Sequence, residues 1–84
     1  MTVLQTSTFS RTSKKLDQNQ KHSLDEAIRT LMEQALVGDS KKGDLAGIRV
    51  FKFRMNNQAM LLAYTFNEQS QTMTLIALGP HENF

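Results

Sequence analysis

The second half of the chain alternates in a way that constrains its fold more than any other feature. Between residues 48 and 55, Lys52 and Arg54 fall on one parity, and Phe51 and Phe53 fall on the other. Successive side chains of a β-strand point to opposite faces of its sheet. A half-buried sheet packs its aromatic residues against the core, so this pattern predicts a strand with its cations on an open sheet face.

Two more strands are expected to follow this one. Asn56 and Asn57 suit a short turn, because asparagine tolerates a positive φ better than most residues. Apolar strands are predicted at residues 59–67 and 72–78, with a polar turn at residues 68–71 between them. Three strands joined by such short connections predict an antiparallel meander.

The first half of the chain has helical periodicity. A first short helix is predicted at residues 7–17, from apolar and small side chains that recur at three and four positions. Ser23 with Glu26 three residues later has the pattern of a capping box, which predicts a second helix over 23–37 that Gly38 ends. The expected apolar face of this helix consists of Leu24, Ala27, Ile28, Leu31, Met32, Ala35 and Leu36.

The predicted order of elements is a short strand at residues 2–5, two helices and a three-strand meander, which is an α+β arrangement. A chain of 84 residues forms one small domain. The absence of cysteine excludes disulfides, thiolate metal sites and cysteine nucleophiles. No apolar run approaches the roughly 18–20 residues that span a bilayer, so no membrane partner and a cytoplasmic location are expected.

The strand cations and one histidine are the candidates for chemistry. Lys52 and Arg54 are suited to binding phosphates, although exposed cations also serve simply to keep a surface soluble. Histidine suits general acid–base work near neutral pH, which makes His81 either a catalytic group or a bystander in the tail. Arg49 has the parity of the aromatics and either binds phosphate or caps the preceding loop. No set of His, Asp and Glu has metal-ligand spacing, so no metal site is predicted.

Three segments together carry a family resemblance. They are GDLAGIRVFKFR in the first strand of the meander, LLAYTF in the second, and the ending LIALGPHENF. With them, the sequence resembles the RelE/ParE superfamily of toxins from bacterial type II toxin–antitoxin modules over nearly its whole length. The resemblance implies a single small α+β domain in which two helices pack on one side of a twisted antiparallel sheet.

The resemblance implies two different activities. RelE-like members are endoribonucleases that cut mRNA on the ribosome, and they need no metal or nucleotide cofactor. ParE-like members share the fold and inhibit DNA gyrase, and an inactive relative that only binds antitoxin is a third alternative. The RelE-like alternative makes Lys52, Arg54 and His81 the expected catalytic residues. The expected RNA contacts are Arg49, Lys41, Lys42 and Phe84.

The resemblance also implies partners and shows one clear departure. A cognate antitoxin is expected in a hetero-oligomer with the toxin, and a ribonuclease would also bind mRNA and the ribosome. Leu61 stands where RelE itself carries a catalytic arginine. This sequence ends at Phe84, without the C-terminal helix or tail of many members.

Overall fold

The computed structural model describes residues 1–83, apart from the side chains of Leu45 and Asn83, and Phe84 lies outside the described residues. The elements in chain order are β1 (Thr2–Gln5), α1 (Ser7–Lys14), α2 (Gln18–Glu33), β2 (Asp39–Ser40), the 3-10 turn η1 (Gly43–Leu45), β3 (Arg49–Met55), β4 (Gln58–Asn67), β5 (Thr72–Pro80) and the 3-10 turn η2 (His81–Asn83). The predicted α+β domain is confirmed, and β2, η1 and η2 are additions to it.

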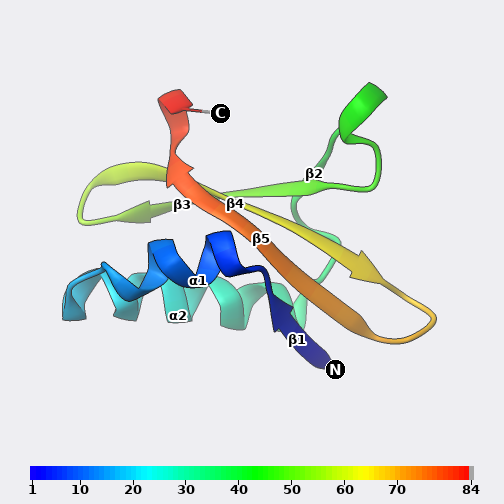
Figure 1. Ribbon diagram of the computed structural model, residues 1–84, viewed down its shortest axis with the longest axis horizontal. Helices are drawn as coiled ribbons and strands as arrows, with labels where there is room; N and C mark the ends of the chain where they lie inside the picture. Colours follow the sequence, from blue (N-terminus) through cyan, green and yellow to red (C-terminus); the bar gives the residue numbers. More distant parts are fainter. Residues whose placement is uncertain (84) are drawn as a thin grey trace.

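The five strands form one mixed sheet in the order β1-β5-β4-β3-β2. The predicted antiparallel meander of β3, β4 and β5 is confirmed. β1 instead pairs in parallel with β5, so the sheet is not wholly antiparallel. Thr6 fixes this crossover, because its N–H donates to the carbonyl of Leu75 and its hydroxyl donates to the carbonyl of Ile76. Both helices lie on the same side of the sheet (Figure 1).

The second helix begins at Gln18, so the prediction of Ser23 as its N-cap is wrong. Asp17 is the N-cap: its carboxylate accepts from the N–H of Gln20 at 2.8 Å, and the Gln20 side chain accepts from the N–H of Asp17 at 2.9 Å. Ser23 lies inside the helix, where its hydroxyl donates to the carbonyl of Asn19. Residues 18–22, which the prediction placed before the second helix, are therefore the beginning of α2. The first helix correspondingly ends earlier than expected, at residue 14.

The end of the second helix was also predicted too late. α2 ends at Glu33, because Gln34 leaves the helical conformation with φ −136° and ψ 72°. The predicted apolar face is buried only in part, at Leu24, Ala27 and Leu31. Met32 and Leu36 remain 47% and 48% exposed. No helix in the described part of the chain has the length and apolarity to cross a membrane.

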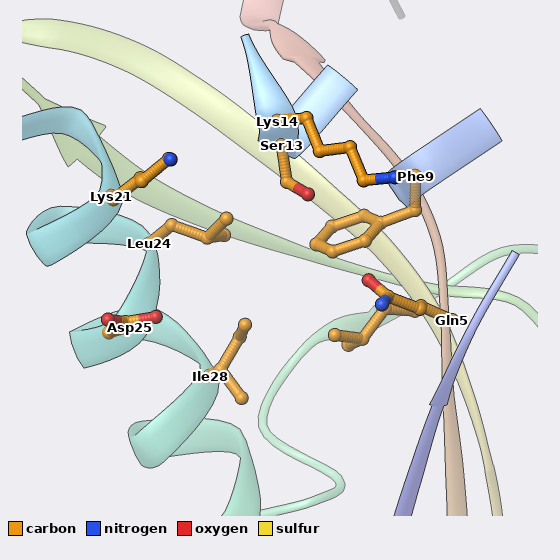
Figure 2. Close-up of a pocket in the computed structure, with 9 residues that line it drawn as sticks. Gln5, Phe9, Ser13, Lys14, Lys21, Leu24, Asp25 and Ile28 are labelled. Carbon is orange, nitrogen blue, oxygen red and sulfur yellow. The ribbon is translucent and has the colours of Figure 1, made fainter. Parts of the chain in front are cut away.

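The hydrophobic core fills the space between the helices and the sheet. Figure 2 shows Phe9 of α1 facing Leu24 and Ile28 of α2, along a groove of about 290 Å³ between the two helices. The buried members of this core are Phe9, Leu24, Leu31, Met55, Met60, Leu62, Tyr64, Met73, Leu75 and Leu78. Phe51 and Phe53 pack against it from β3 with their rings stacked 6.2 Å apart, which confirms their predicted parity.

Tyr64 ties the segment after α2 to the middle of the sheet. Its ring is fully buried, and its hydroxyl accepts from the N–H of Gly38 at 3.0 Å and donates to the carbonyl of Ala35 at 2.8 Å. The cross-strand neighbour Arg49 donates from Nη1 to the carbonyls of Leu36 and Gly38. Gly38 is in close contact with the ring, since a Cβ there would lie 2.7 Å from Tyr64 Oη. Residues 35–38 are therefore held by side chains of the sheet.

Removing the Tyr64 hydroxyl should give a pH-dependent loss of stability. Burial raises the pKa of the Tyr64 phenol above its ordinary value of 10.0, against the smaller opposing effects of the Gly38 hydrogen bond and the Arg49 charge. A raised pKa means that the stability gained from the neutral phenol is complete below about pH 10 and is lost as the pH rises through the folded-state pKa.

We expect Tyr64→Phe to lower the free energy of unfolding by about 1–3 kcal/mol near neutral pH, because buried partners lose their hydrogen bonds. The difference in free energy of unfolding between Tyr64→Phe and the wild type should narrow above about pH 10, because only the wild type has a phenol whose stabilising contribution is lost there. Urea unfolding followed by circular dichroism at both pH values measures the gap. A gap that stays constant between them would contradict this account of Tyr64.

Candidate functional site

The sheet face opposite the helices contains a hollow of about 400 Å³, which we call the open-face hollow. It is bounded by two polar residues, Lys41 and His81, and by six aliphatic ones, Ile48, Val50, Leu61, Ala63, Ile76 and Ala77. The strand register brings its centre together, because Val50 pairs with Ala63 and Ala63 pairs with Ala77. Three adjacent strands therefore form its floor.

The floor of the open-face hollow is apolar and well packed. Val50, Leu61 and Ala63 are only 9%, 8% and 6% exposed, although they are not part of the core cluster beneath the helices. The register between β4 and β5 shifts next to Ala63, so that Ala77 opposes Ala63 while Leu75 opposes Tyr64. This irregularity inserts Ile76 as an extra residue and brings it to the hollow. The result is an aliphatic surface where phosphate chemistry would need polar groups.

Lys41 and His81 both lie on the open face, and they border the hollow from two strands that are not neighbours, β2 and β5. Lys41 follows β2 and is held in place by its N–H, which donates to the carbonyl of Ile48 at 2.9 Å. His81 is the first residue of η2, directly after β5, and it is exposed. β3 and β4 lie between β2 and β5. In Figure 1, η1 and η2 both rise on the side away from α1 and α2, so they flank the open face.

The predicted catalytic residues Lys52 and Arg54 are exposed, as their parity indicated, but they do not line the open-face hollow. Lys52 borders it, because Lys52 pairs directly with the floor residue Leu61. Arg54 lies farther along β3, where its Nη1 donates to the carbonyl of Asn57 in the β3–β4 turn at 2.9 Å. The structure therefore brings Lys52 close to the hollow that His81 flanks and places Arg54 at a separate turn.

Two other predicted RNA contacts, Arg49 and Lys42, do not line the open-face hollow. Arg49 has the parity of the helix-facing side chains, and its guanidinium is bonded to the carbonyls of Leu36 and Gly38. The structure shows Arg49 in contact with a loop, which is one of the two roles considered for it. The loop is the segment after α2, and not the one directly before β3. Lys42 is exposed beside Lys41 and does not line the hollow.

The charges around the open-face hollow have no ionic partners among the described residues. The ion pair found among residues 1–83 joins His22 and Glu26 at 3.0 Å on the exposed surface of α2. Lys41, Lys52 and His81 make no ion pair with any described residue. Within the same part of the chain, no three side chains of His, Asp or Glu gather as a metal site. The basic groups at this face are the imidazole of His81 and the ammonium groups of Lys41 and Lys52.

Sequence reasoning missed the apolar hollow, although a signal for it was present. The run Met60 to Ala63 is continuously apolar, and a strand without alternation is buried on both faces. All four of these residues have exposures of 8% or less, Met60 and Leu62 on the helix-covered face and Leu61 and Ala63 on the open face. The contribution of Ile76 had no such signal, because it depends on the irregular pairing between β4 and β5.

The fold is shared with solved bacterial toxins. The intact RelBE toxin–antitoxin complex of Escherichia coli is similar over 94% of each chain, with a TM-score of 0.76 and 14% identity. The YoeB/ParE toxin of Agrobacterium tumefaciens is similar over 96% of this chain and 99% of its own, with a TM-score of 0.76 and 18% identity. The RelBE2 complex of Mycobacterium tuberculosis reaches a TM-score of 0.67 and 24% identity over 95% and 96%.

Sequence comparison gives a family assignment. None of the curated proteins compared with this chain matches it significantly. The family model of the ParE-like toxin of type II bacterial toxin–antitoxin systems matches residues 3–84. That match spans nearly the whole domain and agrees with the resemblance of its three strand segments to the RelE/ParE superfamily. The chain therefore belongs to the ParE-like toxins of type II bacterial toxin–antitoxin systems.

Proposed function

We propose that this toxin is a ribosome-dependent endoribonuclease that binds mRNA across the open-face hollow. The observation that carries the proposal is the placement of Lys41 and His81 on opposite sides of one hollow, with Lys52 bordering it. All three side chains are exposed and lack ionic partners among the described residues. Positive charge on an uncovered sheet face attracts the phosphates of RNA.

The proposed step is a metal-independent transfer within the RNA. The ribose 2′-oxygen loses its proton and attacks the adjacent phosphorus, which forms a 2′,3′-cyclic phosphate. The bond from phosphorus to the 5′-oxygen breaks, and the leaving 5′-oxygen takes up a proton. His81 transfers the proton, as an imidazole can both accept and donate one near neutral pH. Lys52 neutralises the charge that develops on the phosphoryl oxygens, and Lys41 binds a neighbouring phosphate of the RNA. Arg54 binds the RNA backbone farther along, at the β3–β4 turn.

The proposed partner in the resting cell is a cognate antitoxin. The Escherichia coli and Mycobacterium tuberculosis relatives were both solved as toxin–antitoxin complexes. An antitoxin segment laid over the aliphatic floor would bury Val50 and Leu61 further and exclude RNA from the same surface. A toxin–antitoxin hetero-oligomer therefore explains inhibition by simple competition.

A second candidate function is inhibition of DNA gyrase. The observation in its favour is Leu61, an apolar residue in the floor between the two polar sides of the open-face hollow. An aliphatic hollow also suits an apolar side chain of another protein. Expression of the chain without antitoxin separates the candidates: we expect translation to stop and messages to be cut. Intact messages with a DNA-damage response would instead support gyrase as the target.

Replacement of His81 should abolish most cleavage and leave binding unchanged. A positioned proton-transfer group contributes about 10²–10⁴-fold to a rate, so His81→Ala should slow cutting of ribosome-bound mRNA by that factor. Primer extension on the message measures cutting, and co-sedimentation measures ribosome affinity. His22→Ala is the matched control, because His22 is exposed on α2 far along the chain from the hollow. Undiminished cleavage by His81→Ala would remove His81 from the mechanism.

Removal of the two lysines at the open face should change the salt dependence of binding. Each phosphate contact to single-stranded RNA contributes about 0.7 to the slope of log affinity against log salt. The double variant Lys41→Ala/Lys52→Ala should therefore bind ribosomes with a slope that is lower by up to about 1.4. The control Lys21→Ala/Arg29→Ala removes the same charge from the exposed surface of α2. An equal change of slope in both double variants would show a non-specific effect of net charge.

A further inference from the structure

The aliphatic floor of the open-face hollow has no part in the proton and phosphate chemistry proposed above. Six of the eight residues around the hollow are Ile, Val, Leu or Ala, and the two polar ones stand at its opposite sides. Water in such a hollow finds few hydrogen-bond partners on the floor, so an apolar occupant gains free energy by displacing it.

We infer that the open-face hollow binds one unstacked base of single-stranded RNA, with Lys41 and His81 contacting the phosphates on either side of that base. The inference rests on the proposed function for the choice of RNA as the ligand. Along single-stranded RNA, each nucleotide presents the apolar face of its base between two phosphates. The open-face hollow presents the complementary order, which is a basic group, an aliphatic floor and a second polar group.

The geometry of the sheet supports this order. Lys41 follows β2 and His81 follows β5, so three inter-strand spacings, or roughly 14 Å, separate the strands that carry them. The register also offsets the two residues along the strands, because Lys41 is bonded to Ile48 near the Tyr64 end of β4 and His81 follows Pro80, which pairs with Met60 near the other end. Both side chains border the same hollow of about 400 Å³, a volume that accommodates one planar base. Val50, Ala63 and Ala77 form a continuous row across the floor, which provides a smooth surface for its face.

The basic sides favour a nucleotide over a peptide side chain. An apolar side chain of a partner protein would need only the floor, whereas Lys41 and His81 would remain without a role. The described lining contains no carboxylate to repel a phosphate. Lys52, paired with Leu61 at the border, adds a further cation along the path that the strand would take.

The test uses a probe that cannot be cut. The deoxy trinucleotide dA-dA-dA lacks the 2′-hydroxyl, and a second trinucleotide has the same phosphates with an abasic central residue. Binding is followed by NMR of methyl-labelled protein. We expect dA-dA-dA to shift the methyl signals of Leu61, Ala63 and Ala77 and to bind about tenfold more tightly than the abasic probe, because the base buries apolar surface against the aliphatic floor. Equal affinity of the two probes, or no shifts at the floor, would overturn the inference.

A hollow-filling variant gives the second arm. Ala63→Phe places a ring into the open-face hollow and should lower the affinity for dA-dA-dA to that of the abasic probe. Ala59→Phe is the matched control, since Ala59 is on the same strand and the same parity but outside the hollow. An unchanged preference for the base in Ala63→Phe would also overturn the inference. If this variant fails to fold, the comparison of the two probes on the wild type decides alone.

The outcomes separate this inference from the proposed function. If the protein binds the base but leaves mRNA intact, the base-binding hollow is supported and the proposed endoribonuclease activity is refuted. Cleavage of mRNA by a protein that does not distinguish the abasic probe would retain the nuclease and refute the base site.

Discussion

The hydrogen bonds of the Tyr64 hydroxyl are the constraint on which the site depends. They join the carbonyl of Ala35 and the N–H of Gly38 to the middle of the sheet, and Arg49 adds two bonds to the same segment. That segment has no regular structure of its own and leads directly into β2. Because β2 contributes only two residues, its position on β3 is set largely by this attachment. Lys41 reaches its side of the open-face hollow as a consequence.

The open-face hollow follows from a small sheet that has helices on one side only. Both helices cover the face with Leu62 and Tyr64, which leaves Leu61 and Ala63 on the other. These residues are nevertheless buried, within the hollow that Lys41 and His81 border. The polar groups of the proposed site therefore come from the ends of strands, and the strand centres supply only an aliphatic floor. Under the proposed function, binding of a base and transfer of a proton would therefore fall to different parts of the chain.

Local patterns predicted the meander and the parity of β3, since alternation reports directly which side chains are buried. The start of α2 was misplaced because Ser23 with Glu26 has the pattern of a capping box, whereas the box that forms is Asp17 with Gln20 and Ser23 lies inside the helix. The parallel pairing of β1 and the register shift beside Ile76 depend on contacts between distant segments, which leave no local pattern. A continuously apolar strand in the sequence indicated the apolar floor. No pattern in the sequence indicated that Lys41 and His81 border this floor.

The close approach of Gly38 to the Tyr64 ring has an evolutionary consequence. Any side chain at position 38 would meet the phenol at 2.7–2.8 Å, so the two positions cannot drift independently. A relative that acquires alanine at position 38 must also acquire a smaller residue at position 64 or move its chain away from the sheet. Either change alters the route into β2 and with it the lysine beside the open face. These two buried positions should therefore covary among relatives that preserve the toxin's surface.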